Sequence, residues 1–304
     1  MTCKSCFFPL LASLLAFSAQ ADEIDATRLS DTVKVLASDE FEGRAPGGPG
    51  EAKTIAYLEE RFTELGLEPG GANGGWTQAV PLIHTQLQQP VKLAFALGAV
   101  RQPLVQGQDV EVSTVRALEQ IRIDHAPVVF VGFGVHAPER QWDDFGDIDL
   151  SGKVALFLVN DPDFAAAPDE PAAGRFGNKR MTYYGRWTYK FEEAARRGAL
   201  AALVIHEDKA AGYGWNVASS SPGENYSIVR GPGDAEPITL QGWMHGDAAA
   251  QVFERAGLKL EEQRRLARSP DFKAFELEGV TFDADLAVQV ERMLQKGKLA
   301  QNQA

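Results

Sequence analysis

The sequence contains little cysteine, little histidine and too little positive charge to balance its acids. Its two cysteines, Cys3 and Cys6, both stand near the N-terminus, and five histidines are spread over 304 residues. Lysine and arginine number 30 against 42 aspartate and glutamate residues, a formal net charge of −12. Because an acidic chain is not attracted to phosphates or anionic lipid, we expect neither a nucleic-acid partner nor a membrane-surface role.

A long hydrophobic segment is missing as well. The apolar run at residues 7–17 is too short to span a bilayer, and the small residues Ala19 and Ala21 that follow it form a typical cleavage site. We therefore predict a signal peptide over residues 1–21, cleaved after Ala21, and a periplasmic or secreted mature chain without a membrane span. Both cysteines belong to this leader, so the mature protein has neither a disulfide nor a cysteine metal ligand.

The hydrophobic spacing changes along the chain. Over residues 51–67 the apolar side chains recur at helical spacing, and this stripe consists of Ile55, Leu58, Phe62 and Leu65. From Trp76 onward, short apolar runs separated by glycine, proline and aspartate predict strands and turns. Further helices are predicted at 187–198, 246–256 and 259–268, a buried strand at 200–205 and an alternating strand at 282–290.

This pattern predicts an α+β fold, in which an N-terminal helical segment is followed by a β-rich domain with flanking helices. The predicted boundaries are 1–21 for the signal peptide, 22–75 for the helical segment, 76–245 for the β-rich domain, 246–294 for exit helices and a strand, and 295–304 for a polar tail that we expect to be disordered.

Several motifs that imitate known sites have a structural interpretation that we favour. Residues 132–137 match G-x-G-x-x-A after a strand, but Pro138 follows instead of the helix that a dinucleotide site needs, so a tight turn is expected. His245 and Asp247 have zinc-peptidase spacing, but an acid at a helix start is favoured by the helix dipole. His206 is interpreted as the polar end of a strand. The acidic cluster more often forms turns than a calcium loop, and its members are Asp143, Asp144, Asp147 and Asp149.

Two segments are unusually rich in aromatic residues that carry polar groups. They cover residues 181–191 and 212–216. Such rings suit peptide contacts. Trp187 and Phe191 are i,i+4 neighbours, so these rings equally suit a helix face that packs into the core.

A wider set of motifs resembles one family, the secreted co-catalytic zinc aminopeptidases of peptidase family M twenty-eight, which carry an inserted protease-associated (PA) domain. The first part of the resemblance lies in residues 36–47, 50–52 and 57–58. The part that resembles the PA domain lies in residues 131–134, 137–139, 142–145, 152–154, 160–164, 183–190 and 212–216. On this resemblance the β-rich domain at 76–245 is expected to be PA-like.

The resemblance implies a metallopeptidase that removes N-terminal residues with two zinc ions. The histidine and carboxylate series that holds those ions in the family is not found in this sequence, so no catalytic residue and no metal ligand can be placed on it. We therefore expect a truncated relative that is inactive alone. The PA domain covers the active-site cleft in the family, and the resemblance implies a lid surface formed by Tyr183, Tyr184, Arg186, Trp187, Tyr213 and Trp215.

Three alternatives remain open at this point. The chain could be a free-standing peptide-binding module, the non-catalytic half of a split peptidase whose missing catalytic domain is its partner, or a decayed product. An exposed apolar stripe on the helix at 51–67 is expected if a partner domain is absent.

Overall fold

The computed structural model describes residues 24–71, 74–220 and 222–294, so the predicted signal peptide and polar tail lie outside the described residues. The chain divides into two compact units, Met1–Glu68 and Pro69–Ala304.

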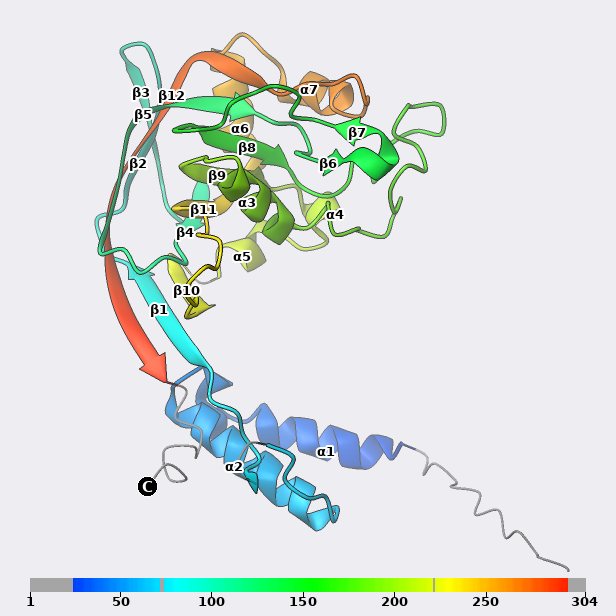
Figure 1. Ribbon diagram of the computed structural model, residues 1–304, viewed down its shortest axis with the longest axis vertical. Coiled ribbons are helices and arrows are strands. Elements are labelled where there is room, and N and C mark those ends of the chain that lie inside the picture. The colour runs from blue at the N-terminus through cyan, green and yellow to red at the C-terminus, as the bar shows by residue number, and fades with distance from the viewer. Residues whose placement is uncertain (1–23, 72–73, 221, 295–304) are drawn as a thin grey trace, which may run out of the picture. The chain divides into compact units, whose positions relative to one another are not determined.

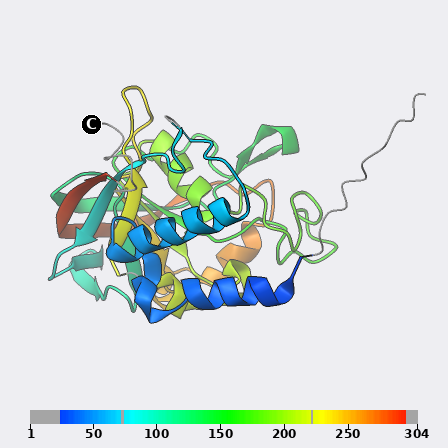
Figure 2. The same cartoon turned by 90° about the horizontal axis from the view of Figure 1, so that it is seen from below.

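The first unit is helical. It contains helix α1 (Ala26–Leu36), the 3-10 segment η1 (Asp39–Arg44) and helix α2 (Pro49–Glu64), and both helices extend from η1 (Figures 1 and 2). Asp25 starts α1 because its carboxylate accepts hydrogen bonds from the backbone N–H groups of Thr27 and Arg28.

The packing inside this unit is sparse. Phe41 of η1 is buried, and its ring meets that of Tyr57 edge to face at 6.1 Å. Of the apolar stripe on α2, Phe62 and Leu65 are 38% and 62% exposed, and the two others are half-buried. The expected poor burial of the stripe is therefore confirmed for its C-terminal half.

The second unit is built on one mixed sheet of ten strands. The strand order is β10-β1-β12-β5-β8-β9-β11-β4, with β2 paired to β12 and β3 paired to β2. These strands are β1 (Pro81–Leu87), β2 (Lys92–Leu97), β3 (Val100–Leu104), β4 (Val110–Ser113), β5 (Gln120–Phe130), β8 (Val154–Leu158), β9 (Ala201–Ile205), β10 (Glu224–Ile228), β11 (Leu240–Met244) and β12 (Phe275–Leu294). Strands β6 (His136–Ala137) and β7 (Trp142–Asp143) form a separate pair.

The helices of this unit are short and lie between the strands along the chain. They are η3 (Pro138–Arg140), α3 (Trp187–Arg196), α4 (Asp208–Ala211), α5 (Trp215–Ala218), α6 (Gly246–Arg255) and α7 (Leu260–Leu266). Within the described residues, no helix combines the length and the apolar composition that a membrane crossing requires.

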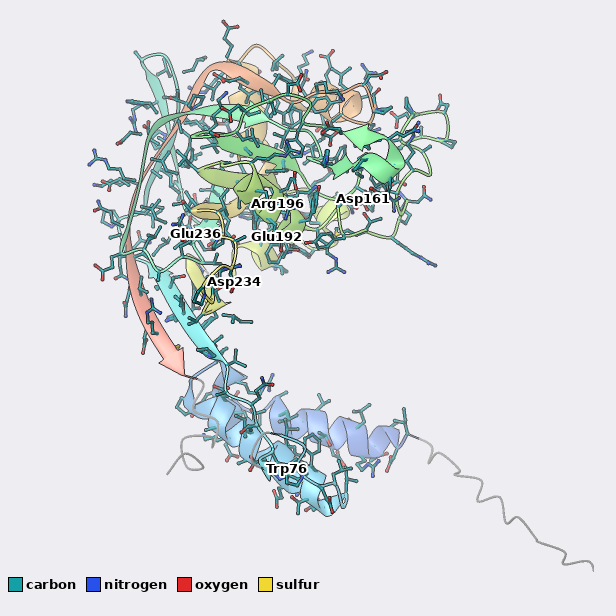
Figure 3. The ribbon with its side chains drawn as sticks, viewed as in Figure 1. Trp76, Asp161, Glu192, Arg196, Asp234 and Glu236 are labelled. Carbon is teal, nitrogen blue, oxygen red and sulfur yellow. The ribbon has the colours of Figure 1, made fainter. Side chains whose placement is uncertain are left out.

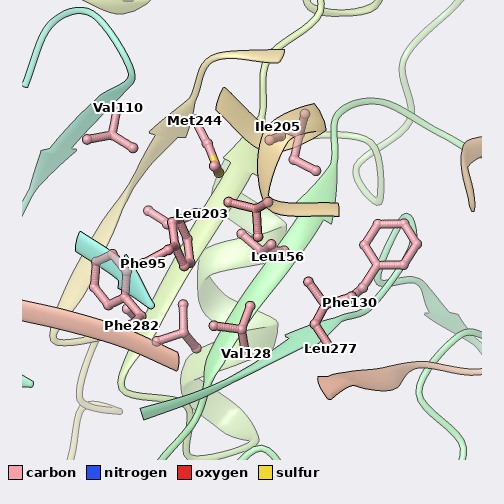
Figure 4. Close-up of a cluster of buried hydrophobic side chains, with 14 of the residues drawn as sticks. Phe95, Val110, Val128, Phe130, Leu156, Leu203, Ile205, Met244, Leu277 and Phe282 are labelled. Atoms are coloured by element: carbon pink, nitrogen blue, oxygen red, sulfur yellow. The ribbon is translucent and has the colours of Figure 1, made fainter. Parts of the chain in front are cut away.

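Four neighbouring strands, β5, β8, β9 and β11, run parallel. Every residue of β8 and β9 is buried, because both faces of these strands are covered. Residues on one face belong to the larger core with α6, and residues on the other face belong to a second core with α3. The larger core includes Phe95 and Phe282, whose rings lie 5.2 Å apart (Figure 4).

Strand β12 holds the sheet together. Its 20 residues pair with β1, β2 and β5, so it lies in the middle of the sheet instead of leading away from it. The sheet also curls until its two ends meet (Figure 1). Asn225 of β10 donates to the Ser113 hydroxyl of β4 at 3.2 Å, and Thr85 of β1 donates to the carbonyl of Thr114 at 2.6 Å.

The structure confirms the α+β class. The helices at 187–198, 246–256 and 259–268 and the strand at 200–205 were predicted to within a few residues, while β3, β4, β10 and β11 were missed. Strand β12, which lies in the predicted 246–294 segment, pairs with β1, β2 and β5 of the predicted 76–245 domain, so the two ranges contribute to one sheet.

Candidate functional site

A single buried lysine organises one end of the parallel strands. Lys190 lies in α3 and is fully buried. Its ammonium group donates to the carbonyl of Phe133 at 2.6 Å and to those of Asn160 and Tyr184 at 3.3 Å each. These carbonyls follow β5, follow β8 and precede α3, so one side chain connects three segments that are distant in the sequence.

Two buried carboxylates accompany this lysine. Asp144 accepts from the Trp142 indole at 2.7 Å and from the backbone of Val135 at 2.9 Å. Asp161 accepts from the backbone and the hydroxyl of Thr182 at 2.6 and 2.7 Å. Burial raises the pKa of Asp144 to about 7 and also raises the pKa of Asp161. Burial lowers the pKa of Lys190 to about 8, although the charges of both carboxylates oppose that shift.

This network fixes the segment that leads into α3. Gly185 packs so tightly against Asp161 that a Cβ on it would lie 3.0 Å from the Asp161 backbone nitrogen and carboxyl carbon. The segment then turns into α3 at Arg186, which occupies the N-cap position. Arg186 and Trp187 are consequently held on the surface, and Trp187 is 42% exposed.

Two cavities meet at Trp187. The smaller one has a volume of about 150 Å³ and is lined by Arg186, Trp187, Tyr213 and Trp243, among others. The larger one has a volume of about 590 Å³ and runs along α3. Trp187 and Thr188 line both cavities, so the two are neighbours along one surface, which we call the α3 groove.

The wall of the α3 groove combines apolar and polar groups. Its apolar part includes Trp187, Phe191 and Ile238, and Asn225 and Ser227 of the edge strand β10 contribute an amide and a hydroxyl. Its charged residues are Glu192 and Arg196 on α3, Arg230, and Glu236 in the segment before β11; three of them are labelled in Figure 3.

The structure brings together three of the six predicted lid residues. Arg186, Trp187 and Tyr213 all line the smaller cavity. Tyr183 is exposed and its hydroxyl donates to Glu192. Tyr184 turns the other way, since its hydroxyl donates to Glu139 at 2.9 Å and its ring packs on Phe176 and Tyr189.

Trp215 is the sixth predicted lid residue, and it packs into an aromatic cluster. Its indole donates to the carbonyl of Gly107 at 2.9 Å, and its ring lies 5.5 Å from His206 and 5.2 Å from His245. Tyr184 and Trp215 line neither cavity of the groove. An aromatic residue whose polar group is hydrogen-bonded inside the fold contributes to packing. The sequence pattern does not distinguish such a residue from one that faces a ligand.

His206 directly follows strand β9, close to the strand end that the sequence indicated, and is 3% exposed. Its ring is surrounded by Tyr213, Trp215 and Trp243 at centroid distances of 5.5–5.6 Å. Burial lowers its pKa, so the imidazole is favoured in its neutral form. Its Nε2 atom is buried and has no hydrogen-bond partner among the described residues.

The motifs that imitate known sites form turns and caps. Gly132 and Gly134 adopt φ values of 57° and 61°, and no helix that could bind a pyrophosphate follows them. Asp143 and Asp149 each accept a backbone N–H two residues ahead, which confirms the turn interpretation of the acidic cluster.

The zinc-like pair at 245 and 247 is also structural. His245 is the N-cap of α6, and its Nδ1 accepts from the backbone of Asp247 at 3.3 Å. Over residues 24–71, 74–220 and 222–294, no three histidine, cysteine, aspartate or glutamate side chains converge as metal ligands. The residues present in these ranges therefore do not fit the zinc pair that the resemblance implies.

Several groove residues were not singled out from the sequence. Arg196, Arg230, Glu236 and Ile238 come from α3 and from the segment before β11, which are far apart in the chain. No local sequence pattern connects that segment to the helix.

Comparisons with known proteins find likeness only among solved structures. No protein-family model matches the chain, and no curated protein matches its sequence. Among solved structures, an aminopeptidase from Aneurinibacillus sp. strain AM-1 is similar with a TM-score of 0.37 and 18% sequence identity. The likeness covers 89% of this chain and 46% of that one, so this chain spans less than half the length of that aminopeptidase.

Proposed function

We propose that this chain is the non-catalytic, peptide-binding portion of an exported, aminopeptidase-like protein. The α3 groove is the observation that carries the proposal. Its volume of about 590 Å³ lies within the range of roughly 300–1,000 Å³ that is typical of ligand sites. In the aminopeptidases that the sequence resembles, water activated by zinc hydrolyses the peptide bond. We propose that residues outside this sequence carry out that step.

The composition of the groove suits an extended peptide. Trp187 offers a large, half-exposed ring that can cover an apolar side chain without much loss of conformational freedom. Asn225, Ser227 and Gln241 supply amide and hydroxyl groups that can pair with a peptide backbone. Asn225 and Ser227 are two residues apart on strand β10, so their side chains point to the same face of the sheet and can act together on one ligand.

The Lys190 network gives this surface the rigidity that binding requires. Lys190 ties the segment before α3 to the ends of β5 and β8. Because the backbone that carries Trp187 is already fixed, peptide binding loses little free energy to ordering this segment. A bound peptide would thus meet a preformed groove.

Binding of fluorescent peptides, measured by anisotropy, tests the proposal. A set of random octapeptides of equal length should contain members that bind saturably to the purified chain. Trp187→Ala should weaken their binding by ~10-fold or more, because truncating a central aromatic residue commonly costs ~1–2 kcal/mol.

The matched control is Tyr184→Leu, which removes an aromatic ring of the same segment that faces away from the groove. Its affinity for peptides should equal that of the unmodified chain. Absence of saturable binding, or equal losses in both variants, would overturn the proposed function.

A further inference from the structure

Charge inside the α3 groove differs in sign from the charge of the whole protein. The chain carries a formal −12. Three arginines and two glutamates line the two cavities: Arg186, Arg196, Arg230, Glu192 and Glu236. Some of these five charges are already neutralised by neighbouring side chains, and others are not.

Glu236 and Arg196 are neutralised within the fold. Glu236 forms an ion pair with Arg116, which also donates to the hydroxyl of Thr239 at 3.0 Å. Arg196 donates to Glu193 at 2.7 Å and lies 3.9 Å from Glu192.

The other charges near the end of this helix balance one another. Glu193 also accepts from Arg197 at 2.7 Å, and Glu192 accepts from the Tyr183 hydroxyl. Arg196, Glu192 and Glu193 of α3 and Arg197 at its C-cap thus form a network whose formal charges cancel.

Arg186 and Arg230 differ from these residues in that their charges are not paired within the described part of the chain. Neither has a carboxylate within ion-pair distance among the described residues, and both side chains are exposed. Arg230 donates only to the carbonyl of Ala235 at 3.3 Å. The nearest acid in its loop, Asp234, accepts from the backbone of Gly231 at 2.7 Å and does not line the cavity.

The two uncompensated arginines stand on different walls of the groove. Arg186 lines the smaller cavity at the start of α3, and Arg230 lines the larger one after β10. Trp187, which lines both cavities, lies between the smaller cavity and the rest of the groove.

We infer that the α3 groove selects acidic peptides, with carboxylates paired to Arg186 and Arg230 and an apolar side chain covering Trp187. This inference rests on the proposed function and names its ligand class. A guanidinium binds a carboxylate through two parallel hydrogen bonds, so each arginine can hold one acidic side chain or the C-terminal carboxylate. The acidic surface elsewhere repels such a peptide, which confines it to this groove.

The test compares three peptides of equal length that differ only in charge: a Glu peptide, its Gln analogue and its Lys analogue. The Glu peptide should bind ~10-fold tighter than the Gln analogue, and this advantage should shrink in high salt, because exposed ion pairs are screened. Arg186→Gln and Arg230→Gln should each reduce the advantage of the Glu peptide over the Gln analogue by ~3–5-fold.

Arg122→Gln is the matched control, since Arg122 is an exposed arginine of β5 that pairs with Asp124. Its peptide affinities should equal those of the unmodified chain. Equal binding of the Glu and Gln peptides, or tighter binding of the Lys peptide, would overturn the charge selection but leave the proposed function intact. Failure of all three peptides to bind would overturn both.

Discussion

Replacing Lys190 by methionine is the perturbation that examines the candidate site most deeply. Methionine keeps the length and the apolar stem of the side chain but removes the ammonium group. The carbonyls of Phe133, Asn160 and Tyr184 then lose a donor at 2.6, 3.3 and 3.3 Å in a region without solvent.

The expected loss of stability follows from what is left behind. A buried polar group without its partner costs ~1–3 kcal/mol, and removal of one member of a buried charge arrangement costs ~3–5 kcal/mol. Asp144 and Asp161 would keep their buried carboxylates without the neighbouring cation. We therefore predict that Lys190→Met lowers the free energy of unfolding by ~3–5 kcal/mol.

Urea unfolding followed by tryptophan fluorescence measures this change. The matched control is Lys209→Met, in the exposed last turn of α4, which should change stability by less than ~0.5 kcal/mol. A second variant, Lys190→Met with Asp161→Asn, should recover part of the loss because it removes a carboxylate that has lost its cation. A change below ~1 kcal/mol in Lys190→Met would refute the reasoning, since the ammonium group would then contribute little beyond packing.

The remaining predictions concern the curled sheet and its tight turns. Burial raises the pKa of Glu111 to about 7. The protonated Glu111 side chain therefore contributes its full share of stability below its usual pKa, and this share is lost as the pH rises through 7. Glu111→Gln should flatten the fall in Tm between pH 5 and 8, and an unchanged slope would contradict this. Gly134→Ala should cost ~2 kcal/mol or more in urea unfolding, because its φ is 61° and the new Cβ would lie 2.2 Å from Phe157. Trp142→Phe should cost ~1–3 kcal/mol by losing the hydrogen bond to Asp144, and full stability by calorimetry would count against a role for that bond.

Much of the fold was predictable because its strongest signals are local. The strand at 201–205 is buried on both faces and therefore appears as a continuous apolar run. Helix α3 is amphipathic, with Phe191 and Ala194 buried. Strand β4 was missed because it has only four residues, and no local pattern shows that β12 would extend over 20 residues to pair with three partners.

The candidate site was predictable only in part. The aromatic segment before α3 was found, and Trp187 proves to be exposed while Tyr189 belongs to the core. The segment around Arg230 and Ile238 carries no pattern that marks it as part of a site. It reaches α3 because β11 adds parallel to β9, a long-range pairing that local periodicity cannot reveal.

The most direct measurement is hydrogen–deuterium exchange of the purified chain with and without a saturating acidic peptide. The account predicts slower exchange in residues 183–196 and 224–241, the segments that form the two walls of the α3 groove. Protection that appears only elsewhere, such as around Glu139, or no change in exchange under saturating peptide, would contradict it.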